Sequence, residues 1–127
     1  MDEKIQSKAE QWFHYAEDDL QAAKKLFGEF NHITCFHSQQ SAEKYLKGLL
    51  VLLEKEFRKS HDLNYLIDLL ECDVPEEIMS AAEFLTEYSV EARYPGEFSV
   101  INDPEAQDTL QHAEKIKTFV LDKAKNL

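Results

Sequence analysis

The chain contains few residues that interrupt helices: only three glycines and three prolines occur among its 127 residues. It shows no sustained alternation of apolar and polar residues, which a half-buried strand requires, and no internal repeat or low-complexity tract. Its two cysteines, Cys35 and Cys72, form no CxxC spacing, so neither a disulfide framework nor a zinc motif is expected. These absences together indicate an all-α protein.

Long apolar runs are also lacking. The apolar stretch from Leu49 to Leu53 is an example of the short ones present, and its length is far below the roughly 18 residues that a membrane-spanning helix requires. The first residues, Met1-Asp2-Glu3-Lys4, lack the apolar core of a signal peptide. We therefore expect a soluble, cytoplasmic protein with reduced thiols and no membrane partner.

Positive charge is scarce, because 14 basic residues face 25 acidic ones and the net charge is −11. Such a balance argues against a surface that binds nucleic acid chiefly through phosphate contacts, so RNA is not a favoured partner. The charge is uneven, however. Residues 31–62 hold five basic and four acidic residues, so a local anion site can exist within an acidic exterior.

Apolar residues recur at three- and four-residue steps along most of the chain, which is the pattern of amphipathic helices. The expected helices are residues 3–27 (ended by Gly28), residues 30–56, a short helix after the N-cap Ser60 with Asp62 in its first turn, a helix from the capping box Asp73-Val74-Pro75-Glu76 to Ala92, and a last helix with Asp103 as N-cap and Pro104 at its first position. We predict a single domain over residues 1–127, built as an antiparallel up-down helical bundle of four long helices and one short helix.

The sequence also predicts where Trp12 and the irregular segment from Tyr94 to Asn102 lie. Trp12 falls on the apolar stripe of the first helix, so we expect it in the core rather than at a ligand. The irregular segment from Tyr94 to Asn102 keeps Phe98, Val100 and Ile101. We expect this segment to pack on its own bundle, and the alternative is that it forms a wall of a ligand or dimer cleft.

One face of the central helix 30–56 carries polar residues within roughly 80° of one another. They are His37, Gln40, Lys44 and Lys47, with Ile33 and Val51 on either side. A solvated helix face would explain the polar residues alone. Ile33 and Val51 favour a covered face, hence a pocket or a subunit interface in a homodimer.

The side chains of this face suit a nucleotide: lysine supplies charge for phosphate, an amide can read a base or ribose, and imidazole can donate to oxygen. His61 and Arg93 could join from neighbouring helices, although a local hydrogen bond and a surface salt bridge, respectively, would also explain them. No cofactor or metal is expected, because the ExxH spacing from Glu29 to His32 occurs only once. No glycine-rich phosphate loop is present either.

Three segments carry a family resemblance: Gln39-Gln40-Ser41-Ala42-Glu43-Lys44-Tyr45-Leu46-Lys47, Lys59-Ser60-His61-Asp62-Leu63 and Ala92-Arg93-Tyr94-Pro95. In order and spacing they resemble the HEPN domains. The resemblance implies a small helical bundle that pairs into homodimers and binds nucleotides, often encoded beside a minimal nucleotidyltransferase in a toxin–antitoxin arrangement. It also implies that some members are metal-independent ribonucleases, marked by an arginine followed four to six residues later by a histidine.

This sequence departs from the nuclease pattern, since Arg58 precedes His61 by three positions and Arg93 is followed by no histidine before His112. We therefore interpret the chain as a nucleotide-binding module without catalysis, acting as the homodimeric partner of a nucleotidyltransferase. The alternatives are a metal-independent ribonuclease toxin, with His61 as general acid or base and Arg93 stabilising phosphorane charge, and a purely structural dimerisation module.

Overall fold

The computed structural model describes residues 2–89 and 100–127. Its helices are α1 (Glu3–Leu26), α2 (Asn31–Leu52), α3 (Leu63–Asp68), α4 (Glu76–Thr86) and α5 (Asp103–Lys125). No strand occurs in either described range. The predicted all-α bundle is confirmed.

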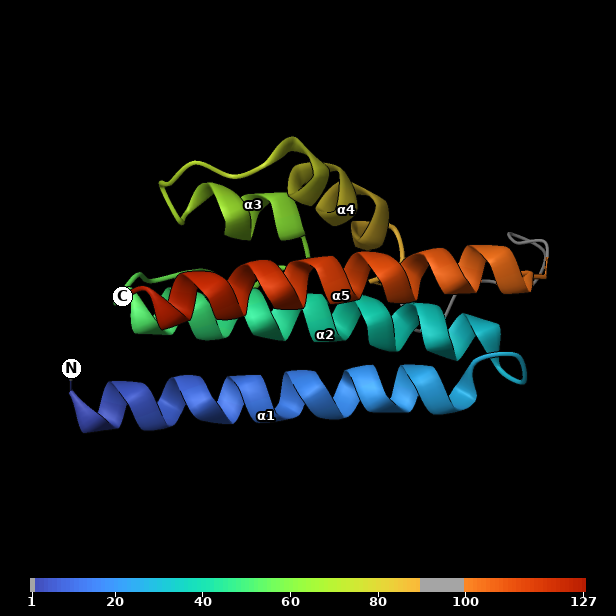
Figure 1. The fold of residues 1–127 in the computed structure, drawn as a ribbon, viewed down its shortest axis with the longest axis horizontal. Helices are drawn as coiled ribbons and strands as arrows, with labels where there is room; N and C mark the ends of the chain where they lie inside the picture. Colours follow the sequence, from blue (N-terminus) through green and yellow to red (C-terminus); the bar gives the residue numbers. More distant parts are fainter. Residues whose placement is uncertain (1, 90–99) are drawn as a thin grey trace.

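The helices form three layers (Figure 1). The central layer consists of α2 and α5, which run side by side, and α1 lies along one side of this pair. The opposite side is covered by α3 and α4, which do not touch α1. Because α2 contacts all four other helices, its side chains must satisfy neighbours in several directions. This central position explains why so many of its residues are buried, polar ones included.

The chain leaves α2 earlier than its apolar stripe suggests. The helix ends at Leu52 rather than near residue 56, and Glu54 then adopts a left-handed conformation with φ of 55°. The next N-cap is Asp62 and not Ser60, since the Asp62 carboxylate accepts hydrogen bonds from the amides of Asn64 and Tyr65. Residues 53–62 thus form a linker between α2 and α3, called the 53–62 linker below.

Three other boundaries also differ from the sequence prediction. The expected capping box at α4 does not form, because Pro75 is the N-cap and no side chain accepts from the first turn. The N-cap of α5 is Asn102, whose side chain accepts from the Glu105 amide, so Asp103 is the first helical residue. The fourth helix ends at Thr86, so its predicted continuation through residues 87–89 is wrong, and the rest of that continuation, to Ala92, lies outside the described residues.

The core lies between α2 and its neighbours and consists mainly of leucine, isoleucine and alanine. Leu46, Leu49 and Leu50 of α2 are all buried within it. Gly48 allows α1 to approach closely, because a Cβ at this position would lie 2.5 Å from the Phe13 ring. Trp12 is only partly buried, so the prediction that it is a core residue was too strong.

The segment expected to fold back on the bundle falls mostly outside the described residues. Val100 is 96% exposed, whereas Ile101 packs on a small cluster formed by Cys35, Tyr88 and Ala106. Within the described part of the chain, every helix is too short or too polar to cross a bilayer.

Candidate functional site: the ionic face of the central helix

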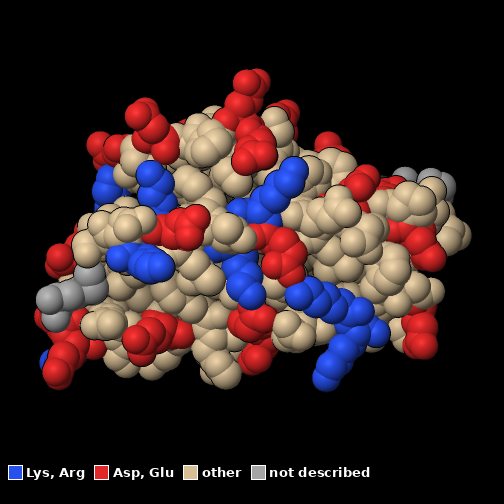
Figure 2. All heavy atoms as spheres, in the orientation of Figure 1, with Lys and Arg blue, Asp and Glu red and all other residues tan. Residues whose placement is uncertain are grey.

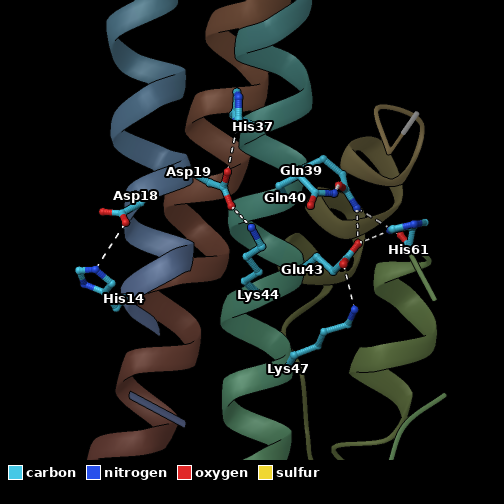
Figure 3. Close-up of polar contacts among 10 residues, drawn as sticks. All are labelled: His14, Asp18, Asp19, His37, Gln39, Gln40, Glu43, Lys44, Lys47 and His61. Atoms are coloured by element: carbon cyan, nitrogen blue, oxygen red, sulfur yellow. Dashed lines mark hydrogen bonds and ion pairs between the residues drawn. The ribbon is translucent and has the colours of Figure 1, made fainter. Parts of the chain in front are cut away.

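The side of α2 that faces away from α5 carries a row of hydrogen-bonded polar side chains (Figure 3). The first group is centred on Asp19 of α1, whose side chain is only 12% exposed. One carboxylate oxygen of Asp19 lies 2.8 Å from His37 Nδ1, and the other accepts a hydrogen bond of 2.6 Å from Lys44 Nζ. We call Asp19, His37 and Lys44 the Asp19 cluster. It joins α1 to α2 through charge as well as packing.

The second group is centred on Glu43 of α2 and is more deeply buried. Glu43 accepts hydrogen bonds of 2.9 Å from Lys47 Nζ and 3.1 Å from Gln39 Nε2, and its Oε1 lies 2.8 Å from His61 Nδ1 (Figure 3). Gln40 extends the group by donating to Gln39 Oε1. We call Gln39, Glu43, Lys47 and His61 the Glu43 cluster. It ties α2 to the 53–62 linker.

The Lys47 side chain, 9% exposed, is enclosed by aromatic rings as well as by the carboxylate. Its ammonium lies 5.6 Å from the centroid of the Trp12 ring and 5.8 Å from that of Phe57. Cations are attracted to the negative faces of such rings at these separations. The buried charge of Lys47 is therefore compensated from two directions.

Electrostatics keep the central carboxylate ionised. Burial alone would raise the pKa of Glu43, but hydrogen bonds from His61, Lys47 and Gln39 outweigh burial and hold the pKa below its ordinary value of 4.5. With Asp19 and Glu43 each facing a lysine, the fixed charges of the two clusters cancel. An incoming phosphate would find Lys44 and Lys47 already paired.

A third carboxylate lies between α1, α2 and α5. Glu17 accepts hydrogen bonds of 2.7 Å from Tyr45 Oη and 2.6 Å from Lys117 Nζ, with a further bond from Gln21. Burial opposes ionisation, yet these donors lower the pKa of Glu17 to about 2. Burial and the negative Glu17 raise the pKa of the Tyr45 phenol. This group holds three helices together.

The face of the molecule drawn in Figure 2 carries no broad basic surface among the described residues. Acidic and basic side chains are interspersed along its helices. Lys24 and Glu114 form an exposed ion pair of 2.7 Å between α1 and α5. In the part of the chain that the structure describes, no group of three or more histidine, cysteine, aspartate or glutamate side chains is placed to hold a metal ion.

Comparison with known proteins places this architecture in a family. Residues 9–124 match the HEPN domain. The chain belongs to the HEPN domain family. No curated protein gives a significant match to this HEPN domain.

Solved structures similar to this HEPN domain include proteins of Thermus thermophilus and Thermotoga maritima and an archaeal protein. The structure of TT1696 from Thermus thermophilus is 32% identical, with a TM-score of 0.80, and the match covers 91% of this chain and 98% of that one. ST0689, described as an archaeal HEPN homologue, is 29% identical with a TM-score of 0.77, covering 91% and 96%. A HEPN domain protein of Thermotoga maritima, tm0613, is 25% identical with a TM-score of 0.75, covering 92% and 99%.

The structure brings the predicted site residues of this HEPN domain into two clusters rather than one. His37 and Lys44 meet at Asp19, whereas Lys47 and His61 meet at Glu43, with Gln40 attached through Gln39. Lys47 was expected to face a pocket or a subunit interface, but Trp12 and Phe57 of the same chain enclose its ammonium. Arg93 lies outside the described residues.

Sequence reasoning missed the carboxylates on which these clusters depend. Glu43 stands four residues before Lys47, the spacing at which opposite charges pair on a helix, so the sequence did contain a signal for it. Asp19 directly precedes the buried Leu20 of α1 and carried no such local signal. Its partners lie 18 and 25 residues away.

Proposed function

We propose that this HEPN domain is a nucleotide-binding module, with its ligand site on the ionic face of α2. One observation supports this most directly: both histidines of the face are held by a carboxylate through Nδ1 while remaining partly exposed, at 29% for His37 and 53% for His61. A histidine held in this way presents its second ring nitrogen, Nε2, in a fixed direction. The Gln40 side chain lies between the two histidines (Figure 3).

The chemistry of these groups fits a nucleotide better than a simple anion. Imidazole and amide groups can hydrogen-bond base and ribose edges, whereas the lysines of the face are already paired with carboxylates. The family resemblance points the same way, since the HEPN domains are named for nucleotide binding. The ligand would therefore be recognised largely through its nucleoside part at α2.

Calorimetric titration with ATP, GTP and a short RNA tests the proposal. We expect weak binding that is reduced by His37→Ala and by Gln40→Ala, because each removes an oriented hydrogen-bonding group. The control is His14→Ala, which removes an exposed histidine that lies 3.5 Å from Asp18 on α1. Absence of heat with every ligand would leave only the structural dimerisation module.

The proposal includes a homodimer, partnered by a nucleotidyltransferase in a toxin–antitoxin type pair. Ile33 and Val51 are partly exposed on the same helix face, and a second copy would cover them. Sedimentation of the purified chain should give about twice 14.8 kDa. Co-purification with the product of a neighbouring nucleotidyltransferase gene would test the partner, and a monomer that binds no such protein would contradict both points.

A second candidate, a metal-independent ribonuclease, is favoured by the pairing of His61 with Glu43 at 2.8 Å. A carboxylate that orients histidine is the usual arrangement for general acid–base catalysis. Cleavage of RNA in the presence of chelator, lost in His61→Ala, would establish this activity. RNA that stays intact at high protein concentration would remove it.

A further inference from the structure

The 53–62 linker contains the cations that the α2 face lacks. Arg58 and Lys59 are both exposed, and among the described residues neither forms an ion pair with a carboxylate. The other cations near the ionic face are Lys44, paired with Asp19, and Lys47, paired with Glu43. Unneutralised positive charge near this face is therefore concentrated in the linker.

Arg58 is held in place rather than free in solvent. Its guanidinium carbon lies 3.9 Å from the centroid of the Tyr65 ring, and its backbone N–H donates a hydrogen bond of 3.1 Å to Tyr65 Oη. When a guanidinium stacks on an aromatic ring, its N–H groups point outward from the edge of the guanidinium plane. They therefore remain available to donate to a planar or tetrahedral anion. Stacking also reduces the conformational entropy that binding would otherwise remove.

The rest of the linker is anchored on both sides of Arg58. Phe57 packs against the core and meets Trp12 edge-to-face at 6.4 Å. Lys55 donates to the Leu70 carbonyl at 3.2 Å, and Ser60 Oγ accepts from the Asp62 amide at 3.1 Å. A loop fixed at so many points presents Arg58 and Lys59 in a defined arrangement.

Nearby acidic residues balance the formal charge of the linker, but among the described residues none of them forms an ion pair with Arg58 or Lys59. The Asp62 carboxylate is engaged by the first amides of α3. Glu54 and Glu56 are exposed and form no ion pair among the described residues. Together with Asp62 they equal in number the three basic residues of the linker, so the linker is formally neutral. In a chain of net charge −11, a neutral segment with a stacked arginine is less repulsive to a phosphate than the acidic remainder of the chain.

The linker also connects directly to the ionic face. Gln39 donates to the backbone carbonyl of His61 at 3.3 Å, and Gln40 donates to Gln39 at 2.7 Å. The hydrogen bond with Glu43 uses only Nδ1 of His61. A ligand contacting Gln40 can thus extend past His61 to the linker.

We propose that Arg58 and Lys59 of the 53–62 linker, with His61 beside them, bind the phosphate groups of the nucleotide. This inference rests on the proposed nucleotide-binding function and moves its phosphate subsite from Lys44 and Lys47 to the linker. Arg58 makes the bidentate contact, and Lys59 adds a second positive charge. Tyr65 is a positioning residue, because it acts only by holding Arg58.

The decisive test compares two double variants that change the net charge equally. Arg58→Gln with Lys59→Gln removes the proposed subsite, whereas Lys24→Gln with Lys25→Gln removes two exposed lysines at the C-terminal end of α1. In calorimetric titration with ATP, we expect the linker variant to bind at least tenfold more weakly than wild type and the α1 variant to stay within about twofold, on the basis of two lost charge-assisted contacts. Circular dichroism must show unchanged helical content in both.

The positioning role of Tyr65 is tested separately. Tyr65→Phe keeps the ring under the guanidinium and should bind ATP nearly as wild type does, whereas Tyr65→Ala should approach the affinity of Arg58→Gln. An Arg58→Lys variant should recover only part of the affinity, because an ammonium supplies charge without the planar fork.

Each result bears on one proposal. Equal weakening of ATP binding in both double variants would show a general charge effect and overturn the linker subsite. Unchanged ATP binding in the linker variant would also overturn it. Neither result would contradict the nucleotide-binding function. If wild type binds no nucleotide, the proposed function fails, and a titration with inorganic pyrophosphate followed by amide NMR still decides the subsite. Shifts at residues 57–62 that vanish in the linker variant would support it, and their absence would overturn it.

Discussion

Removing the charge of Glu43 should destabilise this domain more than removing the charge of its partner Lys47. Glu43 accepts from three donors, and the Lys47 ammonium has no other anion among the described residues. Glu43→Gln would leave that ammonium buried beside Trp12 and Phe57 without a counter-charge. Removing one partner of a buried ion pair typically costs about 3 to 5 kcal/mol, and we expect a loss in this range.

The opposite change leaves a better-satisfied site. In Lys47→Met, the Glu43 carboxylate keeps hydrogen bonds from His61 and Gln39, while the methionine stem continues to pack between the two aromatic rings. We expect a loss of about 1.5 to 3 kcal/mol, the usual contribution of one charge-assisted hydrogen bond. The double variant Glu43→Gln with Lys47→Met should be more stable than Glu43→Gln alone, because no unpaired ammonium remains.

Urea unfolding at neutral pH, followed by circular dichroism, measures these differences directly. The matched control is Glu114→Gln, which removes a carboxylate paired with Lys24 where both side chains are about 40% exposed. Such exposed pairs contribute less than about 1 kcal/mol. If Glu43→Gln cost no more than Glu114→Gln, or if the double variant were the least stable of the set, the Glu43 cluster would not be the buried network described above.

Three further outcomes follow from the structure. Because the pKa of Glu17 falls from 4.5 to about 2 on folding, the ionised carboxylate stabilises the fold fully above pH 4.5, and this stabilisation is lost as the pH falls towards 2. Glu17→Gln should therefore lower the free energy of unfolding by about 1 kcal/mol above pH 4.5, a value reduced for solvent screening because Glu17 is partly exposed. Urea unfolding at a series of pH values should show a progressively smaller difference from wild type below pH 4.5. Gly48→Ala should lower the free energy of unfolding by about 1 to 2 kcal/mol in urea, since the new Cβ would lie 2.5 Å from the Phe13 ring. Trp12→Ala should cost less in the same assay than the ~3 to 5 kcal/mol typical of a fully buried aromatic.

The helices of this fold were predictable because their signals are local. The apolar stripe of α1 and the position of Gly28 were enough to locate Glu3–Leu26 within a residue. Errors arose where two local signals compete. Ser60 and Asp62 can both cap a helix, and Asp62 is the N-cap of α3 because its carboxylate reaches two backbone amides. Asn102 and Asp103 presented the same ambiguity at the start of α5, where Asn102 is the N-cap.

The site was predictable only in part, because burial is not a local property. Helical spacing correctly placed His37 and Lys44 together, but it could not show that Trp12 and the linker residue Phe57 would enclose Lys47. Nor could it show that Asp19 would cross from α1 to neutralise Lys44. Charges that looked available for a ligand are instead used to join helices.

The proposed homodimer interface and the proposed nucleotide site both lie on one face of α2. Ile33 and Val51, which support a dimer, lie on the same α2 face as His37 and Gln40, which support the nucleotide site. A partner subunit and a ligand therefore either compete for this face or share a cleft along it. In both cases the proposed ligand binding and dimerisation would be linked, and by thermodynamic reciprocity the ligand would change the dimer affinity by the same factor as dimerisation changes the ligand affinity. The proposed phosphate subsite on the linker fits the shared cleft, because it would place the charged end of the ligand beyond the α2 residues that a second subunit would cover.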